Sequence, residues 1–111
     1  MNKYTAIGLL AAADEGKRVI VMSSHHRAVR DAVNEVHALV PDLQWNLANS
    51  NERVTLPSGG CIRFLSDDPG RLRGLAADIV LLEDDRDLRH ELLAALHIVI
   101  HSSKHGEIIR Y

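Results

Sequence analysis

Three consecutive carboxylates follow an apolar run in the second half of the chain, and they are well placed to do chemistry. The run is Ile79–Leu82 and the acids are Glu83, Asp84 and Asp85. Four branched apolar residues in a row are typical of a strand buried on both faces of a parallel sheet. Acids at the carboxyl end of such a strand can hold magnesium and orient water during nucleotide hydrolysis. They can also begin a helix, whose dipole favours negative charge there, so both interpretations stay open.

A second group of polar residues falls in two predicted turns and suits contact with phosphate groups. The first turn follows the apolar run at 19–22, and the second precedes the run that ends in acid. A strand, a short polar turn and a helix N-terminus together form an anion site, to which arginines add positive charge. Solvated arginines are the alternative. The candidate contact residues for nucleic acid or another anion are Ser23, Ser24, His25, Arg27, Arg71 and Arg73.

Metal and nucleophile chemistry finds little support in the sequence. Among the seven histidines, His25 and His26 are adjacent and cannot easily face one ion, and a single cysteine excludes a four-cysteine zinc site. Asp78 could join the three acids in a metal nuclease, but no E-x-K pattern follows them. Cys61 lies beside a predicted turn without a nucleophile motif, which favours a partly buried thiol. We therefore predict no catalytic residue, no metal ion and no cofactor.

Alternating helices and strands must position these side chains. Apolar spacing and turn residues predict helices at 4–15, 27–40 and 87–96, and strands at 19–22, 43–47, 54–56, 62–65, 79–82, 98–100 and 107–111. Gly16 is expected to stop the first helix, and Ser23 or Ser24 to cap the second. The turn at 57–60 predicts a hairpin. This order predicts an α/β fold over residues 1–111, a three-layer sandwich with a mainly parallel sheet.

The composition is that of an ordinary globular domain. Apolar residues make up 46% of the 111 residues and charged residues 25%, which argues against a disordered or fibrous protein. The net charge of -2 shows no global excess of basic residues that would indicate nucleic-acid binding. No apolar run reaches the length of a membrane span or a secretory signal, and the single cysteine cannot form an internal disulfide. A cytoplasmic location is therefore expected.

The succession of these segments resembles the RecA-like ATPase core of phage terminase large subunits and superfamily 2 helicases. In that core a phosphate-binding loop opens a helix, which a strand and a second helix follow, as at 17–22 and 27–40 here. Paired strands similar to 54–64 come next, then a Walker B strand ending in acid, similar to 79–84, and a further strand similar to 98–103. The resemblance covers nearly the whole chain and implies a RecA-like fold.

The nucleotide site of that family is altered in this sequence. The pattern G-x-x-x-x-G-K-[ST] is missing, and the pair Gly16-Lys17 follows a predicted helix where the family's loop would precede one. The chain is expected to begin where that loop would finish. Residues 2–5 are at most a degenerate remnant of the loop's lysine and hydroxyl. Glu83 and Asp84 stand where the family has Asp then Glu, which changes the reach of each carboxylate by one methylene. They are interpreted as a Walker B-like remnant in a protein that is not an enzyme.

The resemblance therefore implies a role without catalysis. A sheet that lacks the phosphate-loop strand should expose a backbone edge or an apolar helix face, which a partner must cover. We expect a phage-type protein-binding or regulatory factor in the host cytoplasm, acting on a protein partner or associating with itself as a homodimer. Two alternatives remain open: a nucleic-acid-binding accessory protein, and an ATPase component completed by another chain.

Overall fold

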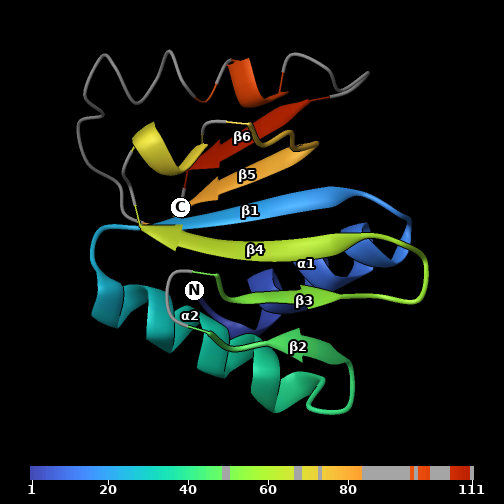
Figure 1. Ribbon diagram of the computed structural model, residues 1–111. Helices are drawn as coiled ribbons and strands as arrows, with labels where there is room; N and C mark the ends of the chain where they lie inside the picture. Colours follow the sequence, from blue (N-terminus) through green and yellow to red (C-terminus); the bar gives the residue numbers. More distant parts are fainter. Residues whose placement is uncertain are drawn as a thin grey trace.

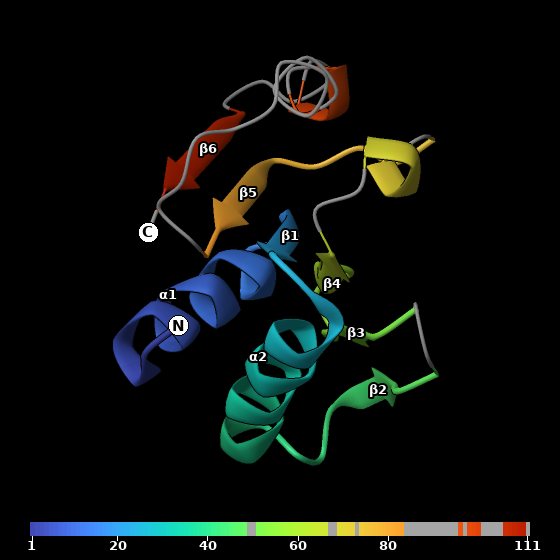
Figure 2. The same cartoon turned by 90° about the vertical axis from the view of Figure 1, so that its left-hand side faces the viewer.

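A computed structural model describes residues 1–48, 51–66, 69–72, 74–83, 96, 98–100 and 106–110. Within these ranges the chain forms a six-stranded sheet in the order β2-β3-β4-β1-β5-β6, with helical segments on both faces (Figures 1 and 2). The elements are α1 (Lys3–Asp14), β1 (Arg18–Ser23), α2 (His26–Leu39), β2 (Gln44–Asn46), β3 (Arg53–Thr55), β4 (Cys61–Ser66), the 3-10 turn η1 (Pro69–Leu72), β5 (Ile79–Leu82) and β6 (Glu107–Arg110). The expected α/β class is confirmed.

The sheet is mixed, where the sequence predicted a mainly parallel one. β1 lies between β4 and β5 and is parallel to both, and β6 is parallel to β5. β3 pairs antiparallel with β4, and β2 pairs antiparallel with β3. The physical reason is loop length, because the short turn between β3 and β4 can only reverse the chain, whereas parallel strands need a longer crossover.

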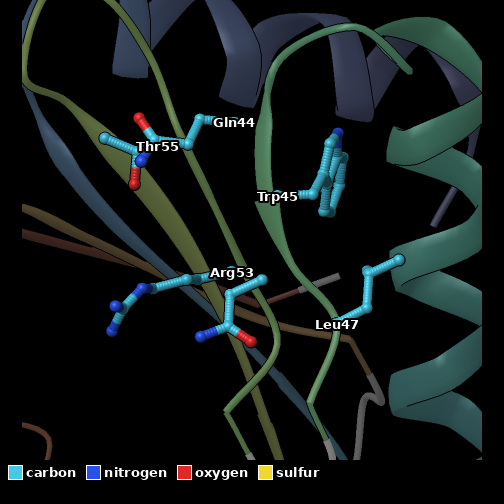
Figure 3. A pocket seen from close by; sticks show the side chains of 6 residues that line it. Gln44, Trp45, Leu47, Arg53 and Thr55 are labelled. Atoms are coloured by element: carbon cyan, nitrogen blue, oxygen red, sulfur yellow. The ribbon is translucent and has the colours of Figure 1, made fainter.

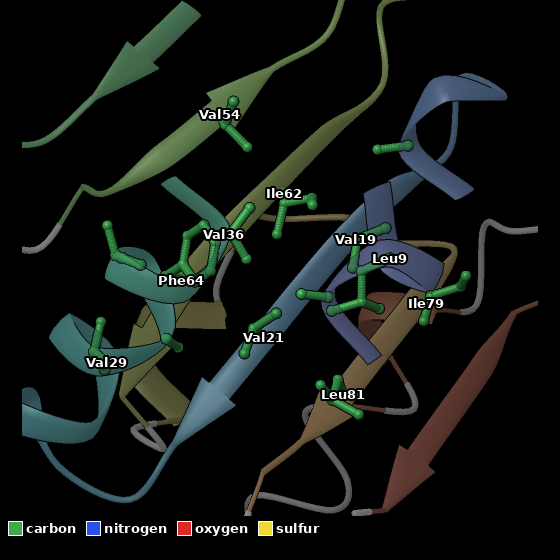
Figure 4. Close-up of a cluster of buried hydrophobic side chains, with 14 of the residues drawn as sticks. Leu9, Val19, Val21, Val29, Val36, Val54, Ile62, Phe64, Ile79 and Leu81 are labelled. Carbon is green, nitrogen blue, oxygen red and sulfur yellow. The ribbon is translucent and has the colours of Figure 1, made fainter. Parts of the chain in front are cut away.

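Two apolar clusters cover the two faces of the parallel half of the sheet. On β1, Val19 and Val21 face α1 and α2, and Ile20 and Met22 face the opposite cluster. Figure 4 shows the first cluster between the sheet and the two helices. The residues of Ile79–Leu82 on β5 alternate between the same two clusters, and all four are buried. The prediction of a strand covered on both faces is therefore confirmed, although β5 lies next to the edge strand β6 and not at the centre.

The first helix, predicted at 4–15, spans Lys3–Asp14, so it begins and ends one residue earlier than its sequence predicts. Asn2 is its N-cap, and its Oδ1 accepts a hydrogen bond of 2.8 Å from the backbone N–H of Thr5. Gly16 follows the helix with a φ of 90°, a conformation that glycine adopts without the steric cost of a Cβ. The buried side of α1 is formed by Ala6, Leu9 and Ala13.

The cap of the second helix differs from the prediction. His25, and neither Ser23 nor Ser24, is the N-cap of α2, and its Nδ1 accepts a hydrogen bond of 3.2 Å from the backbone N–H of Ala28. Ser23 is still part of β1 and is buried, so its hydroxyl turns toward the end of β5. The strand runs one residue further than the apolar pattern indicated, which moves the helix start beyond both serines.

The predicted strand at 98–100 is wrong, since these residues are helical. Leu96 and Val99 are buried against the sheet, while Ile98 is 75% exposed. A strand would place Ile98 and Ile100 on one face, but helical spacing turns Val99 and Ile100 inward together. Most of the helix predicted at 87–96 and the acids Asp84 and Asp85 lie outside the described residues, and the predicted edge strand is confirmed as β6.

Candidate functional site

Glu83 lies at the carboxyl end of β5, where its carboxylate meets the end of the neighbouring strand. Its Oε1 accepts a hydrogen bond of 2.6 Å from the hydroxyl of Ser23, the last residue of β1. The backbone N–H of Glu83 donates to the carbonyl of Met22 over 3.0 Å. Because β1 and β5 are parallel neighbours, their carboxyl ends fall at the same edge of the sheet. The sheet thus brings together two residues that stand 60 positions apart in the sequence.

A positive charge sits against the same carboxylate. The amino group of Met1 donates to Oε2 of Glu83 over 2.7 Å and lies 3.6 Å from an oxygen of Glu35 on α2. Burial by itself would lower the pKa of this amino group, but the hydrogen bond and charge of Glu83, with the charge of Glu35, raise it above its ordinary value. The Glu83 side chain is only 11% exposed, so its negative charge is compensated mainly by the amino group of Met1 and little by bulk water.

The arrangement places one carboxylate and one hydroxyl beside the N-termini of two helices. Met1 and Asn2 directly precede α1, and His25 caps α2. Helix N-termini attract anions, and carboxylate and hydroxyl oxygens are ligands that magnesium accepts. Within the described ranges, no group of three or more His, Cys, Asp or Glu side chains could hold a metal ion. We call this group, Ser23 and Glu83 together with the N-termini of α1 and α2, the acid edge. Its oxygen atoms could contribute ligands to a cation, and its helix N-termini could contact an anion.

Most of the predicted contact residues do gather at the acid edge. Ser24 is half-buried in the turn after β1, and His25 and Arg27 follow it with exposed side chains. Arg71 belongs to η1, but its side chain is not described, and Arg73 lies outside the described residues together with Asp84. The structure therefore places the first predicted turn, which begins at Ser23, next to Glu83. That the second turn, with Arg71 and Arg73, joins them stays a prediction.

Asp78 does not belong to this edge. It precedes β5, whereas Glu83 follows it, so about five residues of extended chain, or about 16 Å, separate their backbones. The two carboxylates cannot converge on one ion. The metal-nuclease grouping of Asp78 with the acids after the strand is therefore wrong, because the strand itself carries them to opposite ends of the sheet.

Asp78 instead forms hydrogen bonds and an ion pair with Arg18, a contact that the sequence did not predict and that we call the clamp. Its Oδ2 accepts a hydrogen bond of 2.8 Å from the backbone N–H of Arg18, and the guanidinium donates to both carboxylate oxygens over 3.3 Å. These hydrogen bonds raise the pKa of Arg18 above its ordinary value. The signal was present in the sequence, since each residue immediately precedes a continuous apolar run. The clamp fixes the start of β1 against the start of β5.

The fold described above, a mixed α/β sheet with the acid edge at the end of β5, is shared with a solved structure. The chain is similar to the large terminase of bacteriophage HK97, known from a crystal structure, with a TM-score of 0.73 and 15% sequence identity. The likeness covers 96% of this chain and spans about a quarter of the terminase, 25% of its length. At this identity it shows the fold alone.

Comparison of the sequence with protein families adds no further relative, since no family model matches it and no curated protein does. Among the described residues, no helix has the length and apolar character needed to cross a membrane. The terminase-like fold is therefore supported by the structural likeness alone.

Proposed function

We propose that this chain is a terminase-like component that acts by binding a protein and does not hydrolyse nucleotide by itself. The acid edge supports the relation to nucleotide-hydrolysing folds, but the sequence carries no glycine-rich loop whose backbone amides could wrap phosphates. The surface of α1 supports the binding role, and this surface is the observation that carries the proposal.

The outer face of α1 is apolar although it is exposed. Tyr4 is 82% exposed and Ile7 47% exposed, and the small residues Gly8 and Ala11 continue the same side of the helix. The opposite side of α1 is also apolar, since it packs into the core. A helix that is apolar around its whole circumference is typical of a helix enclosed on all sides. A protein surface with apolar side chains would therefore complete the burial of α1.

The binding role is tested by affinity capture from host cytoplasm with the full chain. We expect the wild-type chain to retain a specific protein, and the double variant Tyr4→Glu with Ile7→Glu to lose at least about 90% of it, because two buried charges at an interface core are strongly unfavourable. Sedimentation velocity of the purified chain measures self-association on the same variants and distinguishes a homodimer from a complex with a different protein.

A matched control is Ile98→Glu, since Ile98 is also an exposed apolar side chain, at 75%, but lies in the helical residues 98–100 and away from α1. This variant should retain the partner. Circular dichroism checks that all variants keep the fold. A monomeric wild-type chain that captures nothing, or equal loss in the Ile98 and α1 variants, would contradict the proposal.

The second candidate function is an ATPase component whose phosphate loop is supplied by another chain. The contact of Ser23 with Glu83 at the carboxyl edge, directly beside the N-terminus of α1, favours it. With a loop in front of α1, the phosphates would lie at this helix N-terminus, and Glu83 would be positioned to hold magnesium or orient the attacking water. Both roles are compatible with the position that Glu83 already has at the end of β5.

A chimera tests this second candidate directly. An apolar strand and a G-x-x-x-x-G-K-T loop are attached in front of Tyr4, so that the loop leads into α1. If the acid edge is competent, the chimera should hydrolyse ATP with magnesium, and Glu83→Gln should lower the rate at least about 100-fold. The chain without the loop should not hydrolyse ATP. A folded chimera that binds ATP but hydrolyses it equally with and without Glu83→Gln would exclude the acid role.

A further inference from the structure

The antiparallel half of the sheet presents a polar surface on the side away from α2. Val54 of β3 and Trp45 of β2 pack into the core with α1 and α2, so their neighbours along each strand face the other way. Figure 3 shows Arg53 and Thr55 pointing away from Trp45. The side chains of β2, β3 and β4 on this surface, which we call the arginine face, are Gln44, Asn46, Arg53, Thr55, Cys61 and Arg63.

Two arginines stand directly opposite each other on the arginine face. Arg53 of β3 is the register partner of Arg63 of β4, and Asn46 of β2 continues the same row. Like charges at facing positions of an antiparallel pair are destabilising. Within the described part of the chain, neither guanidinium takes part in an ion pair or a side-chain hydrogen bond. Both side chains are half-buried, so the repulsion is only partly screened by water.

Two hollows flank this arginine pair. The first has a volume of about 370 Å³ and is lined by Gln44, Trp45, Asn46, Leu47, Arg53 and Thr55. The second, of about 210 Å³, includes Arg63 and Cys61 together with Arg18 in its lining. Arg18 is already neutralised by Asp78, so Arg53 and Arg63 are the two arginines in the linings of these hollows that have no counter-ion among the described residues. The pair thus lies between two recesses with room for side chains of a ligand.

We propose that the arginine face binds an acidic segment of a partner protein, whose carboxylates pair with Arg53 and Arg63. A guanidinium matches a carboxylate through two parallel hydrogen bonds, which removes the repulsion between the two arginines. The amide and hydroxyl groups of Gln44, Asn46 and Thr55 can form hydrogen bonds with the main chain of the segment. β2 is the edge strand beside the first hollow, so an extended segment can lie along it.

The observations favour a protein carboxylate over a nucleic-acid backbone. Affinity for nucleic acid rises with the number of neutralised phosphates, and this surface offers two uncompensated cations on a chain of net charge -2. It also lacks a platform for bases, because Trp45 points toward α2 and its Nε1 donates to the carbonyl of Val40. The surface lies on the side of the sheet opposite α1, so it is separate from the α1 face of the proposed function and can be tested separately.

The experiment measures binding of a fluorescent peptide of about ten residues, alternating glutamate and threonine, to the full chain by anisotropy. The double variant Arg53→Gln with Arg63→Gln should weaken binding about tenfold, the effect of about two partly screened ion pairs. Raising the salt from about 50 mM to about 200 mM should also weaken it. A peptide with glutamine in place of glutamate should not bind.

The matched control removes the same charge elsewhere, through Lys3→Gln with Lys17→Gln, two exposed side chains at the two ends of α1. Binding of the glutamate peptide should be unchanged in this control. Equal loss in both double variants, binding of the glutamine peptide, or no binding of either peptide would overturn the proposal. So would retention of mixed-sequence duplex DNA that depends on Arg53 and Arg63 when the glutamate peptide is not retained.

Discussion

Replacing Gly60 with alanine should destabilise the protein by about 3 kcal/mol, an effect at the upper end of overpacking in a tight site. A Cβ at this position would overlap the carbonyl oxygen of Ala13 and lie 2.7 Å from its carbon and 2.9 Å from the oxygen of Lys17. All three atoms belong to the backbone, so no side-chain rotation relieves the overlap. The turn between β3 and β4 would have to move away from the end of α1.

Two hydrogen bonds hold that turn in place and make the movement costly. The hydroxyl of Ser58 donates to the carbonyl of Ala13 over 2.7 Å, and the backbone N–H of Gly60 donates to the same hydroxyl over 3.1 Å. The turn also sets the register of β4 with β3, and with it the pairing of Arg53 and Arg63. Urea unfolding monitored by circular dichroism gives the change in the free energy of unfolding.

Two other glycines serve as controls that separate steric overlap from backbone conformation. Gly59 has a φ of 91° but open space around it, so Gly59→Ala should cost about 1 kcal/mol through its conformation alone. Gly8 lies within α1 with nothing within 4 Å, so Gly8→Ala should stabilise the protein by about 0.5 to 1 kcal/mol. A loss at Gly60 no larger than the loss at Gly59 would show that the contact with Ala13 is not tight.

Replacing Phe64 with alanine should destabilise the protein by about 4 kcal/mol, the usual result for a buried aromatic side chain in a closely packed core. Phe64 is 1% exposed and lies in the cluster between the sheet and α2. Its ring stacks on Trp45 with the centroids 6.1 Å apart, and the ring of Trp45 also contacts that of His37 on α2. The cavity would therefore loosen the contact between the antiparallel strands and α2.

Thermal and urea unfolding of the purified variants measure this loss, with Phe64→Leu as a smaller change that should cost about 1 kcal/mol. Leu47→Ala is the exposed control, since Leu47 is 50% exposed, and it should stay within about 0.5 kcal/mol of wild type. If Phe64→Ala cost no more than Phe64→Leu, the cluster would be able to collapse around the missing ring, which would contradict the close packing described here.

At the acid edge, the local sequence pattern predicted the strand and its carboxylate but not the contact between strands. The apolar run at 79–82 and the acids after it were sufficient to predict a buried strand with a carboxylate at its end, because burial on both faces requires an unbroken apolar run. The pairing of Glu83 with Ser23 was not predicted. It depends on β1 lying next to β5, and strand order is a property of the whole sheet that no single segment carries.

On the arginine face, the sequence likewise predicted the strands but not which residues face each other. The apolar stretches at 54–56 and 62–65 around the turn at 57–60 predicted a hairpin, which the structure confirms as the antiparallel pair β3 and β4. The opposition of Arg53 and Arg63 depends on the register, because a shift of β3 by one residue would have placed Arg53 on the core side. The tight turn at Gly60 and the packing of Phe64 fix that register.

The sequence by itself determined the class of fold, both long helices, most of the strands and the acid after β5. These features follow from short-range rules, since apolar periodicity, helix stops and turn residues act within a few positions of the chain. Only the tertiary structure decided that residues 98–100 are helical, that His25 caps α2 and that Asp78 and Glu83 lie at opposite ends of β5. Each of these depends on which segments become neighbours, because burial against a distant surface outweighs the weak preference of a short segment.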